Sequence, residues 1–285
     1  MVDSKLISVW SAHGSAGRST VALGIAGQLA HIGKRVFLLD ADTYSPSLDV
    51  LLSLNDHPAG LAAACRLVSQ NRFDLEQLNR LSVKMSCGSG QLAVMTGLSS
   101  ALRWPEVSVD KLQGLIEVAA QEFEFVILDV AASLEPNLQV FDSTSERNAV
   151  TRWAVSTSDQ ILAICSADPG GVARYLDAYA QLEELVKTGK VTTIVNRLRS
   201  SVLGGSAKQQ ITQTLSRMAH IDVAAFIPDD QAGADQALRA SLPITLGKRS
   251  SPARLALELL TKAELLGERN KLDTRLRKRP LAKLV

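Results

Sequence analysis

Residues 6–20 read LISVWSAHGSAGRST, and the rest of the chain is organised around them. An apolar, β-branched run leads into a short loop of small residues, and residues 21–30 then have a helical apolar face. The order is therefore strand, loop, helix. In such a loop, successive backbone N–H groups converge on an anion, and the new helix adds the positive end of its dipole. This segment predicts a phosphate-binding loop, with the Ser19 hydroxyl placed to ligate Mg²⁺.

The loop departs from the common phosphate-loop pattern G-x-x-x-x-G-K-[ST], which would require glycine at Ala12 and lysine at Arg18. It resembles the deviant loop of the MinD/ParA family, roughly K-G-G-x-G-K-[ST]-T. That pattern overlays without a gap on His13-Gly14-Ser15-Ala16-Gly17-Arg18-Ser19-Thr20. Two glycines and both hydroxyls match, whereas His13, Ser15 and Arg18 replace the signature lysine, a glycine and the second lysine. The resemblance implies that these eight residues bind ATP, with Arg18 acting on the phosphates. A tight strand-to-helix turn without a ligand is the alternative for the loop alone.

Two further apolar strands end in carboxylates. Residues 36–42 read VFLLDAD, and residues 123–131 read FEFVILDVA. The carboxyl ends of parallel strands face the crevice in which α/β proteins bind ligands. The resemblance implies that Asp40 orients the attacking water and that Asp42 and Asp129 join Ser19 in holding Mg²⁺. For Asp42, capping of a helix is the alternative.

Two later motifs extend the resemblance. Residues 192–197 read TTIVNR, and residues 223–230 read VAAFIPDD. In the family, an asparagine at a strand end reads the adenine edge, and the backbone of the Ile-Pro-x-Asp motif flanks the ring. The resemblance therefore places Asn196, Arg197, Pro228 and Asp229 around the base, whereas an asparagine that merely ends a strand is the alternative. The likeness spans residues 5–266 and is nearest to the pilus-associated CpaE/TadZ branch.

The fold that the resemblance implies is α/β, a three-layer, doubly wound and mostly parallel sheet. No Pro/Gly/Ser-rich linker divides the chain, so we expect one nucleotide-binding domain over residues 1–267 and a basic tail over residues 268–285. From Lys248 to the end there are eleven Lys/Arg and four Asp/Glu, whereas the remainder is acidic. We expect the tail to lack fixed structure and to make at most weak contacts with anionic lipid or nucleic acid.

Other classes fit the sequence less well. A dehydrogenase-like Rossmann domain would need G-x-G-x-x-G, which the loop does not provide. The three cysteines are far apart and contain no C-x-x-C pair, which favours reduced structural thiols and does not match the paired cysteines of iron–sulfur relatives. The N-terminus does not resemble a signal peptide, and no uncharged apolar run reaches the about 18–20 residues of a membrane span. We expect a cytoplasmic protein, with peripheral contact at the inner face of the membrane as an alternative.

The substitutions in the loop affect hydrolysis more than binding. Arg18 keeps a positive charge but is a planar fork, and His13 is mostly neutral near pH 7. Phosphoryl transfer depends on charge placed against the transition state, so we expect ATP binding with slow hydrolysis or none. Two functions stay open. One is an ATP-dependent switch that forms a homodimer and positions an unidentified protein partner in a pilus or secretion, division or segregation apparatus. The other is a pseudo-ATPase scaffold of the same fold.

Overall fold

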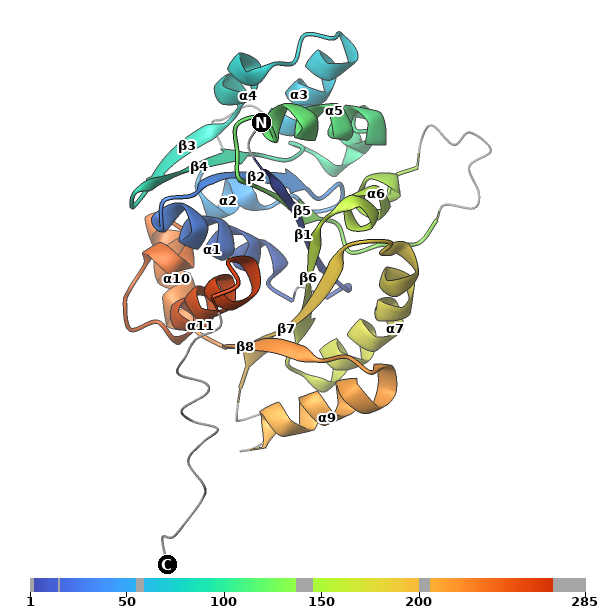
Figure 1. The fold of residues 1–285 in the computed structure, drawn as a ribbon, viewed down its shortest axis with the longest axis vertical. Helices are drawn as coiled ribbons and strands as arrows, with labels where there is room; N and C mark the ends of the chain where they lie inside the picture. Colours follow the sequence, from blue (N-terminus) through green and yellow to red (C-terminus); the bar gives the residue numbers. More distant parts are fainter. Residues whose placement is uncertain (1–2, 15, 55–58, 137–145, 200–205, 269–285) are drawn as a thin grey trace, which may run out of the picture.

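The computed structural model describes residues 3–14, 16–54, 59–136, 146–199 and 206–268. Its centre is an eight-stranded sheet in the order β3-β4-β2-β5-β1-β6-β7-β8, in which only the β3–β4 pair is antiparallel (Figure 1). The strands are β1 (Lys5–Ser11), β2 (Arg35–Ala41), β3 (Val83–Cys87), β4 (Gly90–Met95), β5 (Phe125–Val130), β6 (Gln160–Ser166), β7 (Lys190–Leu198) and β8 (Val223–Pro228).

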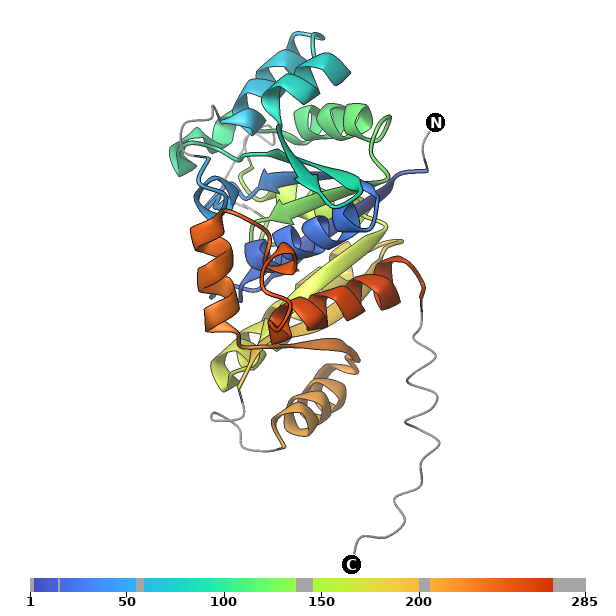
Figure 2. The same cartoon turned by 90° about the vertical axis from the view of Figure 1, so that its left-hand side faces the viewer.

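Helices cover both faces of the sheet and give three layers. One face packs against α1 (Arg18–His31), α2 (Leu48–Leu51), α10 (Gln231–Ala240) and α11 (Pro252–Leu260), which continues as a π-helical turn over Thr261–Leu265. In Figure 2, α1, α10 and α11 lie in front of the sheet. The other face packs against α3 (Gly60–Ser69), α4 (Leu75–Leu81), α5 (Val109–Ala119), α6 (Ala149–Thr157), α7 (Pro169–Leu185) and α9 (Ala207–Ala219). Short 3₁₀ turns lie at Ala101–Glu106 and Ile244–Leu246.

The central strands are buried on both faces because each packs under helices on two sides. β5 is buried along its whole length, and successive β1 side chains alternate between the two cores: Trp10 belongs to one, and Ile7 and Val9 to the other. This explains the unbroken apolar runs in the sequence, since a strand covered on both faces has no polar side.

The strand register brings the predicted site together. β5 lies between β1 and β2, and Asp129 of β5 pairs with Asp40 of β2 in the register. The loops that follow β1, β2 and β5 therefore leave the same edge of the sheet as neighbours.

The predicted α/β fold with a doubly wound, mostly parallel sheet is confirmed. β3 is not predicted from the sequence, because the side chains of this edge strand are exposed or only partly buried before Cys87 and so lack the apolar run of the inner strands. The predicted tail lies outside the described residues from residue 269 onward. No helix within the described ranges is both long and apolar enough to cross a bilayer.

Candidate functional site

The phosphate loop joins β1 to α1 and borders a cavity of about 570 Å³. Gly17 has a left-handed backbone (φ 80°) and directly precedes α1, and no described side chain caps that helix end. The first-turn N–H groups of α1 therefore keep their capacity to bind an anion. The cavity is lined by the loop, by the 42–47 segment and by Ala132 and Arg197. Ser15, one of the predicted loop residues, lies outside the described residues.

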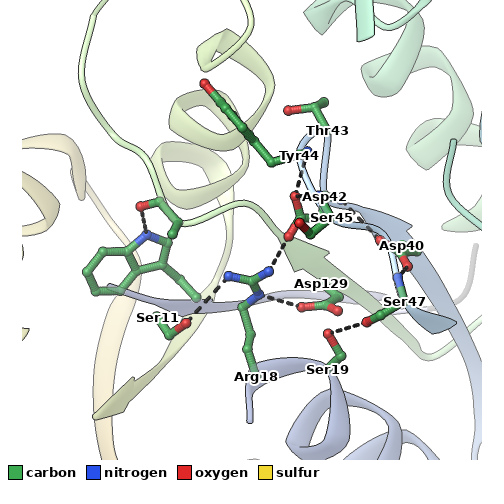
Figure 3. Close-up of polar contacts among 12 residues, drawn as sticks. Ser11, Arg18, Ser19, Asp40, Asp42, Thr43, Tyr44, Ser45, Ser47 and Asp129 are labelled. Atoms are coloured by element: carbon green, nitrogen blue, oxygen red, sulfur yellow. Dashed lines mark hydrogen bonds and ion pairs between the residues drawn. The ribbon is translucent and has the colours of Figure 1, made fainter. Parts of the chain in front are cut away.

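The Arg18 side chain extends from the start of α1 across the ends of β1, β2 and β5 (Figure 3). Its Nε donates to Asp129 Oδ1 at 2.8 Å, and its Nη2 pairs with Asp42 Oδ2. Its Nη1 donates to the Ser11 hydroxyl at 3.4 Å. The side chain is only 13% exposed, and those of Asp42 and Asp129 are 4% and 1% exposed. Arg18 is therefore the cation that balances two buried carboxylates.

Asp40 faces its own backbone turn. Its Oδ1 accepts from the N–H of Asp42 at 3.2 Å, and its Oδ2 accepts from Ser47 at 2.7 Å and Leu48 at 3.0 Å. Burial, together with the negative charge of Asp129, raises the pKa of Asp40 to about 8. Asp40 is therefore mostly protonated near neutral pH, and it holds the segment that presents Asp42 and Ser47. Its predicted role in orienting water stays a prediction.

Asp42 organises the same turn from the other side. Its Oδ1 accepts from the backbone N–H groups of Tyr44 and Ser45 at 2.7 and 2.9 Å, while Oδ2 pairs with Arg18. Burial also raises the pKa of Asp129, and the charge of Arg18 opposes that shift. The ion pair with Arg18 thus favours the charged form of Asp129.

The oxygen donors of this site suit Mg²⁺ in chemical type. They are the Ser19 hydroxyl, which hydrogen-bonds to the Ser47 hydroxyl at 2.9 Å, and the carboxylates of Asp42 and Asp129. Asp129 Oδ2 is buried and has no hydrogen-bond partner among the described residues. Such an unpaired buried oxygen is expected of a ligand that binds a cation. Within the same residues, no three His, Cys, Asp or Glu side chains are grouped to hold a metal by themselves. A metal here would need further oxygens from outside the chain.

The residues predicted around the base border a neighbouring cavity of about 330 Å³. Asn196, Arg197, Pro228 and Asp229 all line it, together with Gly17 of the loop. Asn196 Nδ2 donates to the backbone oxygen of Ala16 at 2.8 Å, so this side chain also fixes the loop to β7. Arg197 has a left-handed backbone (φ 59°) and lines both cavities. The structure therefore places the residues predicted around the base next to the residues predicted around the phosphates.

Comparison with known proteins supports the P-loop NTPase fold. The family model described as ParA, NUBPL iron-transfer P-loop NTPase, matches residues 3–130. Septum site-determining protein MinD of Synechocystis is 24% identical over 232 residues, which are 80% of this chain and 77% of that protein. The chain is therefore similar to the ParA/MinD family of P-loop NTPases. Two solved structures share the fold of this protein. A ParA family ATPase from Chlorobium tepidum has a TM-score of 0.74 at 17% identity, covering 90% of this chain and 97% of that one. MinD from Pyrococcus horikoshii, complexed with Mg-ADP, has a TM-score of 0.68 at 16% identity, covering 94% and 99%.

One cation beside the loop was not predicted from the sequence. Arg174 of α7 reaches the phosphate loop, where its Nε donates to the His13 backbone oxygen at 3.1 Å. Its guanidinium lies against Gly14, where an added Cβ would come within 2.9 Å of Nε. No ion pair joins Arg174 to a carboxylate in the part of the chain that the structure describes. A positive charge thus lies beside the His13–Gly14 segment of the loop.

The three cysteines lie apart from the site. Cys65, Cys87 and Cys165 are buried and free, on α3, β3 and β6. Burial raises the pKa of the Cys65 and Cys165 thiols to about 12. These thiols are therefore protonated at neutral pH, which agrees with the structural role expected of them.

Proposed function

We propose that the protein is an ATP-binding switch of the MinD/ParA type that dimerises with nucleotide and positions a protein partner, with weak hydrolysis. The observation that supports it best is the uncapped start of α1 behind Gly17, placed beside the carboxylates of Asp42 and Asp129. Backbone N–H groups, a helix dipole and oxygen ligands for a cation are the parts that phosphate binding with Mg²⁺ requires.

ATP would lie across the two neighbouring cavities. Its phosphates would meet the loop from His13 to Thr20, and its base would enter the cavity lined by Asn196, Arg197, Pro228 and Asp229. Ser19, Asp42 and Asp129 would hold Mg²⁺, which neutralises phosphate charge when bound. A structural relative in complex with Mg-ADP supports this choice of ligand.

The positions of the charged groups support the proposal of weak hydrolysis. Arg18 is committed to Asp42 and Asp129, and Asp40 accepts hydrogen bonds from backbone N–H groups of its own turn. Catalysis of phosphoryl transfer requires charge and a positioned water at the reacting phosphate. Neither Arg18 nor Asp40 is placed for that task without rearrangement. The same placement of Arg18 and Asp40 favours the second candidate, a pseudo-ATPase scaffold that organises partners without turnover.

The partner and the place of action are proposals of the same kind. The partner would belong to a pilus or secretion, division or segregation apparatus, and the relatives named for septum-site determination support such a positioning role. The CpaE/TadZ branch, a cytoplasmic location and weak contacts of the basic tail with membrane or nucleic acid remain part of this proposal.

Titration calorimetry with ATP and ADP in Mg²⁺ tests the assignment. Wild type should bind, and Ser19→Ala should weaken binding about tenfold because it removes a predicted cation ligand. Ser69→Ala is the matched control, since among the described residues that exposed hydroxyl donates one hydrogen bond, to the Arg66 carbonyl at the end of α3. Equal affinities for wild type and Ser19→Ala would refute the site. Phosphate release from bound ATP then separates the switch, which turns over slowly, from the scaffold, which does not.

A further inference from the structure

The guanidinium of Arg18 lies among the groups that a metal ion would use. Its three nitrogens contact one oxygen each from Asp42, Asp129 and Ser11, and the neighbouring Ser19 hydroxyl is paired with Ser47 (Figure 3). Two buried carboxylates at one point would otherwise repel each other and attract a cation from solution. The chain supplies that cation itself.

We propose that Arg18 is a placeholder for Mg²⁺: in the ligand-free protein it occupies the carboxylates of Asp42 and Asp129, so the metal enters only with the nucleotide. This proposal deepens the proposed function and rests on it for the nucleotide step. When phosphates occupy the loop, they offer the guanidinium a bidentate partner of higher charge. Arg18 then transfers from the carboxylates to the phosphates, and the freed carboxylate oxygens become available to Mg²⁺.

Three features of the structure support an exchange of this kind. The first residue of a helix can move its side chain without disturbing the backbone hydrogen bonds that hold the turn. Arg18 lines the same cavity as the loop, so its route to the phosphates is open. Asp129 Oδ2 remains without a hydrogen-bond partner among the described residues even with Arg18 in place. This oxygen is therefore available to Mg²⁺ once Arg18 has moved to the phosphates.

The test uses Mg²⁺ alone, without nucleotide, and measures thermal unfolding. In wild type, millimolar Mg²⁺ should leave the midpoint unchanged relative to EDTA at matched ionic strength. In Arg18→Gln, the midpoint in EDTA should fall by about 6–10 °C because two buried carboxylates lose their partner. Mg²⁺ should restore at least half of that loss, because the metal replaces the missing guanidinium.

Two variants control this test. Arg103→Gln also breaks an arginine–carboxylate pair, the partly exposed pair with Glu106, and should gain no response to Mg²⁺. In Arg18→Gln with Asp129→Asn, the restoration by Mg²⁺ should disappear. A wild type that Mg²⁺ stabilises as much as it stabilises Arg18→Gln would overturn the proposal, as would an Arg18→Gln protein that does not respond.

A second measurement applies if Arg18→Gln does not fold. Electron paramagnetic resonance of Mn²⁺ added to wild type should show no tightly bound metal in the ligand-free protein and a bound ion once ATP is present. Tight Mn²⁺ binding to ligand-free wild type would refute the placeholder even if ATP also binds. Failure of ATP to bind refutes the proposed function instead, and the Mn²⁺ measurement on the ligand-free wild type then still tests the placeholder.

Discussion

Replacing Gly17 by alanine tests how firmly the phosphate loop is held against β7. Gly17 has a φ of 80°, and a Cβ built there would lie 2.5 Å from Asn196 Nδ2. That nitrogen donates to the Ala16 backbone oxygen at 2.8 Å, and the Asn196 side chain is buried. The methyl group therefore cannot be accommodated unless the amide moves and this hydrogen bond breaks.

The expected loss has two parts. A left-handed backbone destabilises alanine by about 1 kcal/mol relative to glycine. Displacing the Asn196 amide loses a buried hydrogen bond and leaves its partner unsatisfied, which costs about 1–3 kcal/mol. Gly17→Ala should therefore lower the free energy of unfolding by about 2–4 kcal/mol, a large fraction of the stability of an ordinary domain.

Urea unfolding followed by circular dichroism, in EDTA and without nucleotide, measures this loss. Gly33→Ala is the matched control, because Gly33 also has a positive φ (96°) but its Cβ would meet only the Ser89 hydroxyl, at 3.2 Å. Its loss should be about 1 kcal/mol. In an Asn196→Ala background, Gly17→Ala should also cost only about 1 kcal/mol, since the clash is gone. Equal losses for Gly17→Ala and Gly33→Ala, or strictly additive losses for Gly17→Ala and Asn196→Ala, would refute the reasoning.

Four further predictions concern the site and the tail. His13→Lys with Arg18→Lys should raise ATP turnover at least about tenfold, measured as phosphate release, because two charges return to the phosphates. Arg174→Gln should weaken ATP binding about fivefold in calorimetry, because it removes the cation beside the loop; unchanged affinity would leave Arg174 with a structural role only. Asp40, with its pKa raised to about 8, is protonated when folded and ionised when unfolded between about pH 4 and pH 8, so stability should fall as pH rises through that window. The slope is at most about 1.4 kcal/mol per pH unit, and urea midpoints of Asp40→Asn should show a shallower fall than wild type. Removal of residues 269–285 should abolish any sedimentation with anionic liposomes or DNA seen at low salt, whereas binding that persists at high salt would make the tail a true anchor.

The fold could be predicted from local patterns. Strands buried on both faces need unbroken apolar runs, so β1, β2 and β5 were evident as segments, and the small residues before α1 marked the phosphate loop. The carboxylates of Asp40 and Asp129 could be placed at the same edge because parallel strands end together. The edge strand β3 escaped prediction because a partly exposed strand has no such run.

The directions of the side chains depended on the tertiary structure. Arg18 follows the loop in sequence, yet its guanidinium lies on carboxylates that are 24 and 111 residues away. Arg174 and Asn196 reach the loop from α7 and β7, across 161 and 180 residues. A local pattern records which residues are polar and how they are spaced, but it does not record the distances between charges. The low dielectric of the interior makes those distances decisive, because a buried ion must find a partner wherever the fold places one.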